Sequence, residues 1–170
     1  MLQLKKIDNC LPIITEFDPY VPVKIIFGTD IYWADQIAYW RSGNFEDQLI
    51  EVGVSQTSGV IRKITLVATK KINIEEKNFA AVQLKQGIPI FDKINYDKNH
   101  LFDEVGPLEM FIGKEKLQVL FSHNEITLGL TCDRVMCLFD KDNNFCGFEV
   151  TNITEKESKV LKENFITRLQ

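Results

Sequence analysis

The sequence predicts an α+β protein that is predominantly antiparallel β, and three observations lead to this prediction. Five short segments between Leu108 and Val150 carry apolar residues at every second position, residues 50–68 contain two such segments around a polar turn, and the C-terminal residues have helical periodicity. Side chains of a strand point alternately to the two faces of a sheet, so alternation predicts half-buried strands. We expect a five-stranded meander at about residues 108–151, packed with an N-terminal β region and a C-terminal amphipathic helix at about residues 155–169.

Each segment of the predicted meander contributes three alternating apolar residues. The triplets are Leu108/Met110/Ile112, Leu117/Val119/Phe121, Ile126/Leu128/Leu130, Val135/Cys137/Phe139 and Cys146/Phe148/Val150. The connections between the segments are about four or five residues long, which suits antiparallel hairpins. Successive hairpins predict a sheet whose strand order follows the chain.

Four apolar residues of the meander occupy the opposite parity: Phe111, Leu120, Met136 and Leu138. A sheet with one solvated face would be polar at these positions, so we expect another layer to cover this outer face. The N-terminal β region is the predicted cover. The alternative is a single curved sheet whose exposed apolar surface forms a homodimer.

The first forty residues predict short strands. Three prolines, Pro12, Pro19 and Pro22, exclude long helices from the first 29 residues and favour extended chain. Residues 23–27 are predicted as a short strand. Residues 31–40 fit both helical spacing and alternation, and we favour a strand for their second half.

The middle of the chain predicts a second hairpin and then a less regular stretch. Alternating residues 50–54 and 64–68 flank the sequence SQTSG at 55–59, whose Ser and Gly content suits a hairpin turn. Residues 70–107 contain several Gly and Pro breakers, and we expect a short helix from about residue 75 to 84 within them.

The C-terminal helix has a recognisable start. Thr154 is a natural N-cap residue, and Glu157 three positions later completes a capping box. Leu161, Phe165 and Leu169, each four residues apart, form an apolar stripe. We expect this helix to pack across a sheet.

Length and charge narrow the class of protein. A chain of 170 residues fits one globular domain, residues 1–170, and a domain of this size buries roughly 70% of the surface of its unfolded chain. With 20 Lys and Arg against 24 Asp and Glu, the net charge is -4, and no basic cluster is present to neutralise a phosphate backbone. We therefore expect no nucleic-acid partner. The chain also lacks an apolar run near the ~18 residues that span a bilayer, so we expect no membrane association.

The cysteines argue for a reducing compartment and against a metal site. No secretory pattern precedes them, which predicts a cytoplasmic protein. The four residues, Cys10, Cys132, Cys137 and Cys146, lack the CxxC spacing of zinc sites. Two of them lie in the apolar triplets, where a free cysteine behaves as a small hydrophobic residue.

Other polar motifs also fit structural roles. The sequence from Asp140 to Gly147 resembles the start of a calcium loop, but its sixth position is Phe145 and its twelfth is Thr151, so a hairpin turn is favoured. A loose polar cluster, Asp97, His100, Asp103 and Glu104, is interpreted as a solvated loop. Phosphate-binding glycine loops and the usual hydrolase motifs are absent. We assign no catalytic residue, no metal and no cofactor.

The most suggestive segment for function is residues 30–47, which combines large aromatic and acidic side chains. The predicted partner-binding residues are Trp33, Trp40, Asp30, Asp35, Glu46 and Asp47. Aromatic anchors surrounded by acids suit a binding surface for a basic protein, because rigid rings desolvate well while charges steer the encounter. The alternative is that both tryptophans lie in the core.

These observations favour a small acidic cytosolic protein-binding domain, an antitoxin-like or immunity-like inhibitor that acts by occluding a basic partner. Two alternatives stay open. One is a carrier that encloses a small apolar ligand in a cavity of the curved sheet. The other is an enzyme with dispersed acid-base or thiol residues, in which His100 or His123 would meet an acid or a cysteine.

Overall fold

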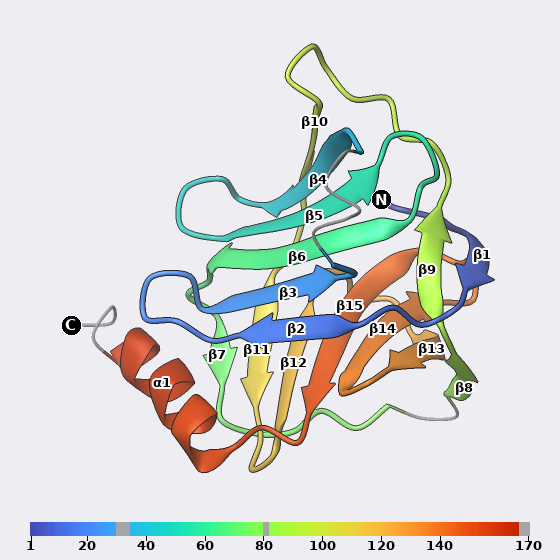
Figure 1. Ribbon diagram of the computed structural model, residues 1–170. Helices are drawn as coiled ribbons and strands as arrows, with labels where there is room; N and C mark the ends of the chain where they lie inside the picture. Colours follow the sequence, from blue (N-terminus) through green and yellow to red (C-terminus); the bar gives the residue numbers. More distant parts are fainter. Residues whose placement is uncertain (30–34, 80–81, 167–170) are drawn as a thin grey trace.

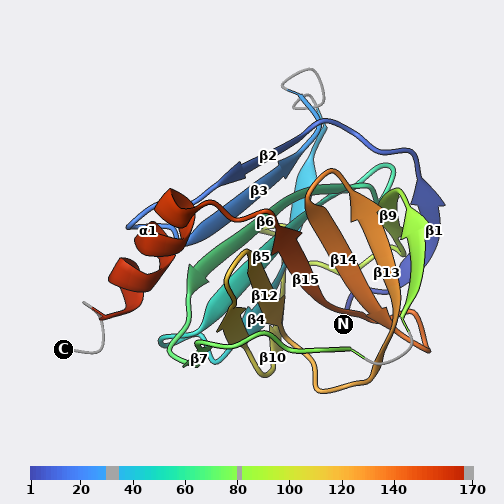
Figure 2. The ribbon, with the colours of Figure 1, turned by 90° about the horizontal axis from the view of Figure 1, so that it is seen from below.

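The computed structural model describes residues 1–29, 35–79 and 82–166 and is mostly β. Within these residues the strands form a six-stranded, a seven-stranded and a two-stranded sheet. The two large sheets pack face to face with their strands crossing at a steep angle, which is the orthogonal class of sheet packing (Figure 1). The two-stranded sheet lies at one end of this sandwich and the single described helix at the other (Figures 1 and 2).

The N-terminal half supplies most of the six-stranded sheet. Its order is β10 (Leu101–Val105), β4 (Ile37–Gly43), β5 (Leu49–Ser55), β6 (Ile61–Ala68), β3 (Val23–Phe27) and β2 (Ile13–Glu16). Neighbours are antiparallel except for β10, which runs parallel to β4. The predicted strand at residues 23–27, the strand in the second half of residues 31–40 and the hairpin at residues 50–68 are confirmed.

The C-terminal half supplies most of the seven-stranded sheet. Its order is β7 (Ile72–Asn73), β11 (Glu109–Ile112), β12 (Lys116–Leu120), β15 (Phe145–Thr151), β14 (Val135–Asp140), β13 (Ile126–Cys132) and β8 (Gln83–Gln86). All five strands of the predicted meander form and share one sheet, but the meander order is wrong. β12 pairs with β15 instead of β13, so β12 to β15 form a Greek key.

Strand spacing explains why the connection length did not reveal this crossing. From β12 to β13 the chain crosses three strand spacings, about 14 Å at ~4.8 Å each. The five residues 121–125 between these strands can reach about 17 Å when extended. A short connection therefore fits a crossing as well as a hairpin.

The two-stranded sheet joins the two large sheets. β1 (Leu4–Asp8) pairs with β9 (Ile88–Phe91), and single bridges connect Gln3 to Asn144 and Val60 to Ile90. The predicted short helix at residues 75–84 is wrong: residues 74–79 are irregular, and β8 instead adds to the edge of β13 in parallel.

The space between the two large sheets is filled by side chains, and aromatic rings occupy its centre. Trp40, Phe91, Phe121, Phe139 and Phe145 are each at most 2% exposed, and their ring centroids lie 5.0–6.3 Å apart along the contacting series. The carrier alternative requires this space for a ligand. In the described residues, it is used for packing instead.

Two β-bulges change which residues of the triplets face this core. The register shifts between Ile126 and Leu128 on β13, and Cys146 is the extra residue where Leu138 pairs with Gly147 and Phe139 with Phe145. Ile126 and Cys146 consequently face outward. Alternation alone could not locate this change, because a bulge reverses the parity of the residues beyond it.

The outer face of the seven-stranded sheet is covered, as its apolar residues require. Its cluster consists of Phe111, Leu120, Ile126, Leu138 and Cys146, with Phe79, Val82 and Met136 packed against it. We call residues 74–79 the covering segment. The prediction that the N-terminal β region provides this cover is wrong, because that region packs against the opposite, inner face.

A buried amide holds the covering segment in place. The Gln118 side chain accepts the backbone N–H of Lys77 at 2.8 Å and donates to the Lys77 carbonyl oxygen at 2.8 Å. The same amide donates to Glu149 at 2.9 Å, and Lys116 pairs with the other Glu149 oxygen at 3.2 Å. Gln118 is 1% exposed, so each of these polar groups has a partner where water is excluded.

The C-terminal helix α1 (Glu155–Ile166) begins as predicted. The Glu157 backbone N–H donates to Thr154 Oγ1 at 3.2 Å, and the Thr154 backbone N–H donates to Glu157 Oε2 at 2.9 Å, which completes the capping box. Leu161 is fully buried, and Leu169 lies outside the described residues. Over the part of the chain that the structure describes, α1 is too short and too polar to cross a bilayer, and no other helix is present.

Candidate functional site

The predicted partner-binding residues are not brought together. Asp30 and Trp33 lie outside the described residues. Trp40 points into the core, 1% exposed, with its indole N–H donating to Glu104 at 2.8 Å and its ring 5.3 Å from that of Phe121. Trp40 therefore lies in the core, which was the alternative to a role in partner binding.

The three predicted acids that the structure describes lie at opposite ends of β4. Asp35 precedes the strand and pairs with Arg62 at 3.4 Å. Glu46 and Asp47 lie in the β4–β5 turn, where the Asn44 side chain accepts the backbone N–H groups of both at 3.0 and 3.1 Å. Seven strand residues separate the two groups, roughly 23 Å at ~3.3 Å per residue. A single patch is therefore excluded for these acids.

The outer face of the six-stranded sheet, which we call the open face, differs from its covered counterpart. The viewer looks onto it in Figure 1, with the seven-stranded sheet behind and α1 beside it. Its side chains come from alternate positions of six strands and are mostly half-exposed. Strand register arranges them in three rows that cross the sheet.

The central row is a ladder of opposite charges. In order from β2 to β10 it contains Glu16, Lys24, Thr65, Glu51, Arg41 and Asp103. Lys24 pairs with Glu16 at 3.2 Å, and the Arg41 guanidinium makes two bonds of 2.7 Å to Asp103. Opposite charges on neighbouring strands stabilise the sheet and satisfy one another.

Apolar rows flank this ladder on both sides. One row contains Ile14, Ile26, Lys63, Gly53, Tyr39 and Leu101. The other contains Ala68, Leu49, Gly43 and Val105. Their outermost members are the most accessible, with Ile14 52% and Val105 80% exposed. The face therefore offers apolar contact surface around charges that already have partners.

One end of the open face has an excess of negative charge, and we call it the acidic end. Arg41 is bonded to Asp103, lies 4.0 Å from Glu51 and is influenced by the charge of Asp97. The hydrogen bonds that Arg41 donates to Asp103 raise the pKa of Arg41 most, burial opposes this effect, and the other carboxylates add to it. Three carboxylates thus face one guanidinium, whose carbon lies 5.8 Å above the centre of the Phe45 ring.

A groove of about 200 Å³ lies beside the acidic end, in the apolar row that contains Tyr39. Ile26, Ile37 and Tyr39 contribute its apolar walls, and Lys24, Arg62 and Lys63 line it with positive charge. The groove and the acidic end thus differ in charge, although both include residues of β4.

The three buried thiols lack the features of catalytic nucleophiles. Burial raises the pKa of Cys132 to about 12, with a smaller contribution from its hydrogen bond with the free thiol of Cys10. Burial also raises the pKa of Cys146, to about 11. Cys137 is fully enclosed, and its pKa is also raised by burial. A reactive cysteine requires the opposite shift, toward the thiolate.

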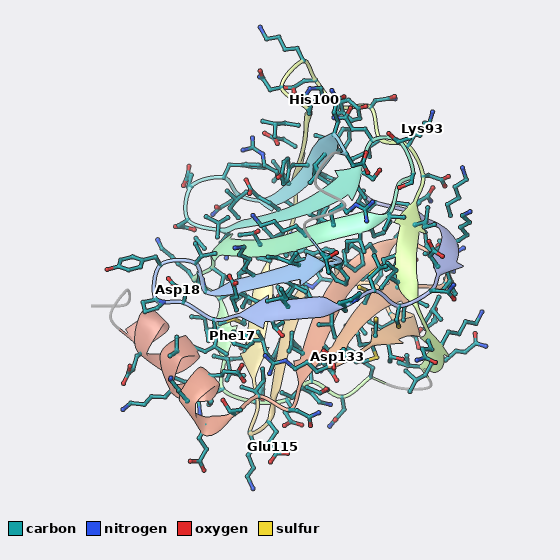
Figure 3. The ribbon with its side chains drawn as sticks, in the orientation of Figure 1. Phe17, Asp18, Lys93, His100, Glu115 and Asp133 are labelled. Atoms are coloured by element: carbon teal, nitrogen blue, oxygen red, sulfur yellow. The ribbon has the colours of Figure 1, made fainter. Side chains whose placement is uncertain are left out.

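The imidazoles do not meet these thiols either. His100 lies on the loop before β10, far from Asp133 and the neighbouring Cys132 (Figure 3), and its ring contacts Tyr96 at 5.6 Å. His123 lies 3.9 Å from Glu109 on the surface of the other sheet. Among the described residues, no group of three His, Cys, Asp or Glu side chains is placed to hold a metal ion.

Sequence reasoning missed the residues that form the open face. Tyr39 and Arg41 lie in the predicted segment 30–47, on the face of the strand opposite to Trp40. Alternation indicates two opposite faces, but it does not show which of them the second sheet covers. Asp103 was assigned to a solvated loop, whereas it lies on β10 and bonds to Arg41 across the strand pair.

The chain matches no protein-family model, and no curated protein is significantly similar to it. The candidate site therefore stands on geometry and charge alone.

Proposed function

We propose that this protein is a binding domain that covers a surface of a basic partner protein, in the manner of an antitoxin-like or immunity-like inhibitor. The observation that carries the proposal is the open face, where two apolar rows flank a ladder of paired charges. The other outer face has a cover from its own chain, whereas the described residues place no element over this one. An uncovered face of this kind is the typical surface for a protein partner.

The acidic end supports the choice of a basic partner. Three carboxylates around Arg41 leave negative charge in excess, and the whole chain carries a net charge of -4. A Lys or Arg from a partner would find a carboxylate there without breaking the Arg41–Asp103 pair, because Glu51 and Asp97 remain within reach. Charge complementarity of this kind speeds association and selects the partner.

Exposed apolar residues beside these carboxylates supply the contact area. Phe45 is 37% exposed and Val105 is 80% exposed. In this proposal, Phe45 and Val105 provide the apolar anchors of the interface, a role that the sequence analysis gave to Trp40. Large apolar side chains beside acids suit an interface in which the rings desolvate and the rim remains polar.

The test is binding with two matched variants. The double change Glu46→Lys and Val105→Ser reverses a charge and removes an apolar contact near the acidic end, and both side chains are exposed, so the fold is retained. Glu125→Lys makes the same charge reversal at an exposed position beyond the seven-stranded sheet. A partner is captured with the wild-type protein, purified and titrated against all three proteins.

We expect the captured partner to be basic, to bind more weakly at high salt and to lose at least about tenfold in affinity with the double variant only. Equal binding by the double variant, or selective loss with Glu125→Lys, would place the interface elsewhere and refute the proposal.

A further inference from the structure

The groove on the open face is lined by residues of β3, β4 and β6, and β5 contributes none of its lining. Gly53 lies between Lys63 and Tyr39 in the apolar row, and β-strand register places all three on the same face. A Cβ atom on Gly53 would lie 3.0 Å from Ile37 Cγ2 and 3.1 Å from Tyr39 Cε1. The side chains of Ile37 and Tyr39 therefore cover the glycine backbone, so they wall the groove and Gly53 itself does not line it.

The size of the groove limits what it can hold. Its volume is about 200 Å³ and its surface is mostly apolar. An apolar protein cavity of ~150 Å³ is known to hold one benzene ring. The groove therefore accommodates a single ring or a short alkyl chain, and it is too small for a helix or a strand of a partner.

The positive charge of the groove determines which polar group a ligand needs beside its apolar part. Lys24 is paired with Glu16 and Arg62 with Asp35, whereas Lys63 has no ion-pair partner among the residues that the structure describes. Lys63 is half-buried in the apolar row between Ile26 and Gly53. Partial burial of an ammonium group is unfavourable unless an anion accompanies it.

Tyr39 supplies a hydrogen-bond donor in the groove. Burial, and then the negative charge of Glu51, raise the pKa of the Tyr39 hydroxyl. The phenol consequently stays neutral at physiological pH and can donate a hydrogen bond to an acceptor in the groove.

We propose that the groove binds a small apolar anion, consisting of one aromatic ring or a short alkyl chain that carries a carboxylate. The apolar part lies between Ile26, Ile37 and Tyr39, and the carboxylate pairs with Lys63. The groove shares the open face with the proposed protein partner, and Tyr39 lies two residues from Arg41 on β4, so a partner that covers the whole face would exclude this ligand. The groove differs from the carrier alternative, since it lies on the surface of one sheet and not between the two.

The first experiment compares three probes by titration of the ¹⁵N-labelled protein. Phenylacetate carries both parts of the ligand, phenylacetamide is its neutral isostere, and acetate has the carboxylate without the ring. We expect phenylacetate to shift the amide signals of Ile26, Gly53 and Lys63, with about tenfold weaker binding of phenylacetamide and weaker binding still of acetate. Equal binding of phenylacetate and phenylacetamide, or shifts confined to residues outside the groove, would overturn the proposal.

The second experiment uses a matched pair of lysine variants. Lys63→Gln should lower the affinity for phenylacetate about tenfold and leave that for phenylacetamide unchanged. Lys85→Gln changes an exposed strand lysine on β8 and should alter neither. Identical affinities of the two variants for phenylacetate would refute the role of Lys63.

A third experiment tests whether the groove binds a free small molecule or the C-terminus of a protein chain. An N-acetylated tripeptide ending in phenylalanine carries the same ring and carboxylate. Weaker binding of this peptide than of phenylacetate supports a free small molecule, and clearly tighter binding would show that the groove is built for a protein C-terminus.

Discussion

The outer faces of the two large sheets both carry apolar side chains, yet among the described residues only the face of the seven-stranded sheet has a cover from its own chain. On the seven-stranded sheet, Phe111, Leu120 and Leu138 form a continuous cluster, and Gln118 fixes the covering segment over it. On the six-stranded sheet a ladder of ion pairs divides the apolar residues into two strips. A continuous apolar cluster must be buried, whereas narrow strips between charges tolerate water and remain available for binding.

The comparison also separates two uses of buried polar groups. Gln118 and Glu149 are both less than 5% exposed, and their bonds hold one segment of the chain against another. Arg41 and Asp103 keep more contact with solvent, 24% and 47% in their side chains, and their bonds stay within the sheet. The first pair therefore stabilises the fold, and the second organises a surface.

The largest expected effect is a difference in stability between truncations on the two faces. Leu138→Ala removes a fully buried side chain under the covering segment, so we expect the free energy of unfolding to fall by about 2–5 kcal/mol. Ile14→Ala removes a side chain that is 52% exposed on the open face, and the expected loss is below about 1 kcal/mol. Urea denaturation of both variants measures the difference. Equal losses would mean that the open face is covered as well.

Alternation in the sequence predicted where the strands lie, but not how they pair or which of their faces is covered. Period-two patterns correctly located the strands from Met110 to Val150, because each needs one buried face whatever its neighbours. They could not show that β12 pairs with β15, since pairing depends on contacts between distant segments. They also could not distinguish Trp40, which points inward, from Tyr39 beside it without knowing on which side the second sheet lies. The cover of the outer face came from residues with no periodicity at all.

A smaller effect is expected at Asp140, which organises the β14–β15 turn of the covered sheet. Its carboxylate accepts the side-chain amides of Asn124 at 2.7 Å and Asn144 at 3.0 Å, as well as the backbone N–H groups of Asp142 and Asn144. Burial acts to raise the pKa of Asp140, but these hydrogen bonds outweigh it and leave the pKa below its ordinary value. The folded protein therefore holds the charged form more strongly than the unfolded chain does.

The sign of the pH dependence follows directly. Because the pKa of Asp140 is lower in the folded protein, its stabilisation is complete above the ordinary value of ~3.9 and is lost as the pH falls through the folded value. Asp140→Asn should cost about 1–3 kcal/mol at pH 7 and progressively less as the pH falls below about 4. Urea denaturation of Asp140→Asn and the wild-type protein at pH 7 and at a pH below about 4 tests this. A deficit that stays constant with pH would show that the charge of Asp140 contributes nothing.

The smallest expected effect on stability is at the acidic end of the open face. Asp103→Asn removes the carboxylate from its two bonds with Arg41, but Glu51 still lies 4.0 Å from the guanidinium, and Asp103 is 47% exposed. We expect the free energy of unfolding to change by less than about 1 kcal/mol. The change should shrink further in 1 M salt, where the Debye length is about 3 Å.

The same substitution sharpens the comparison, because a surface built for binding and a surface built for stability respond differently to it. If the acidic end receives a basic partner, Asp103→Asn weakens that complex while the unfolding curve hardly moves. A loss above about 2 kcal/mol that salt does not reduce would instead describe an ion pair shielded from water, as a covered face would provide. The six-stranded sheet would then resemble the seven-stranded sheet, and its outer face would no longer be a candidate interface.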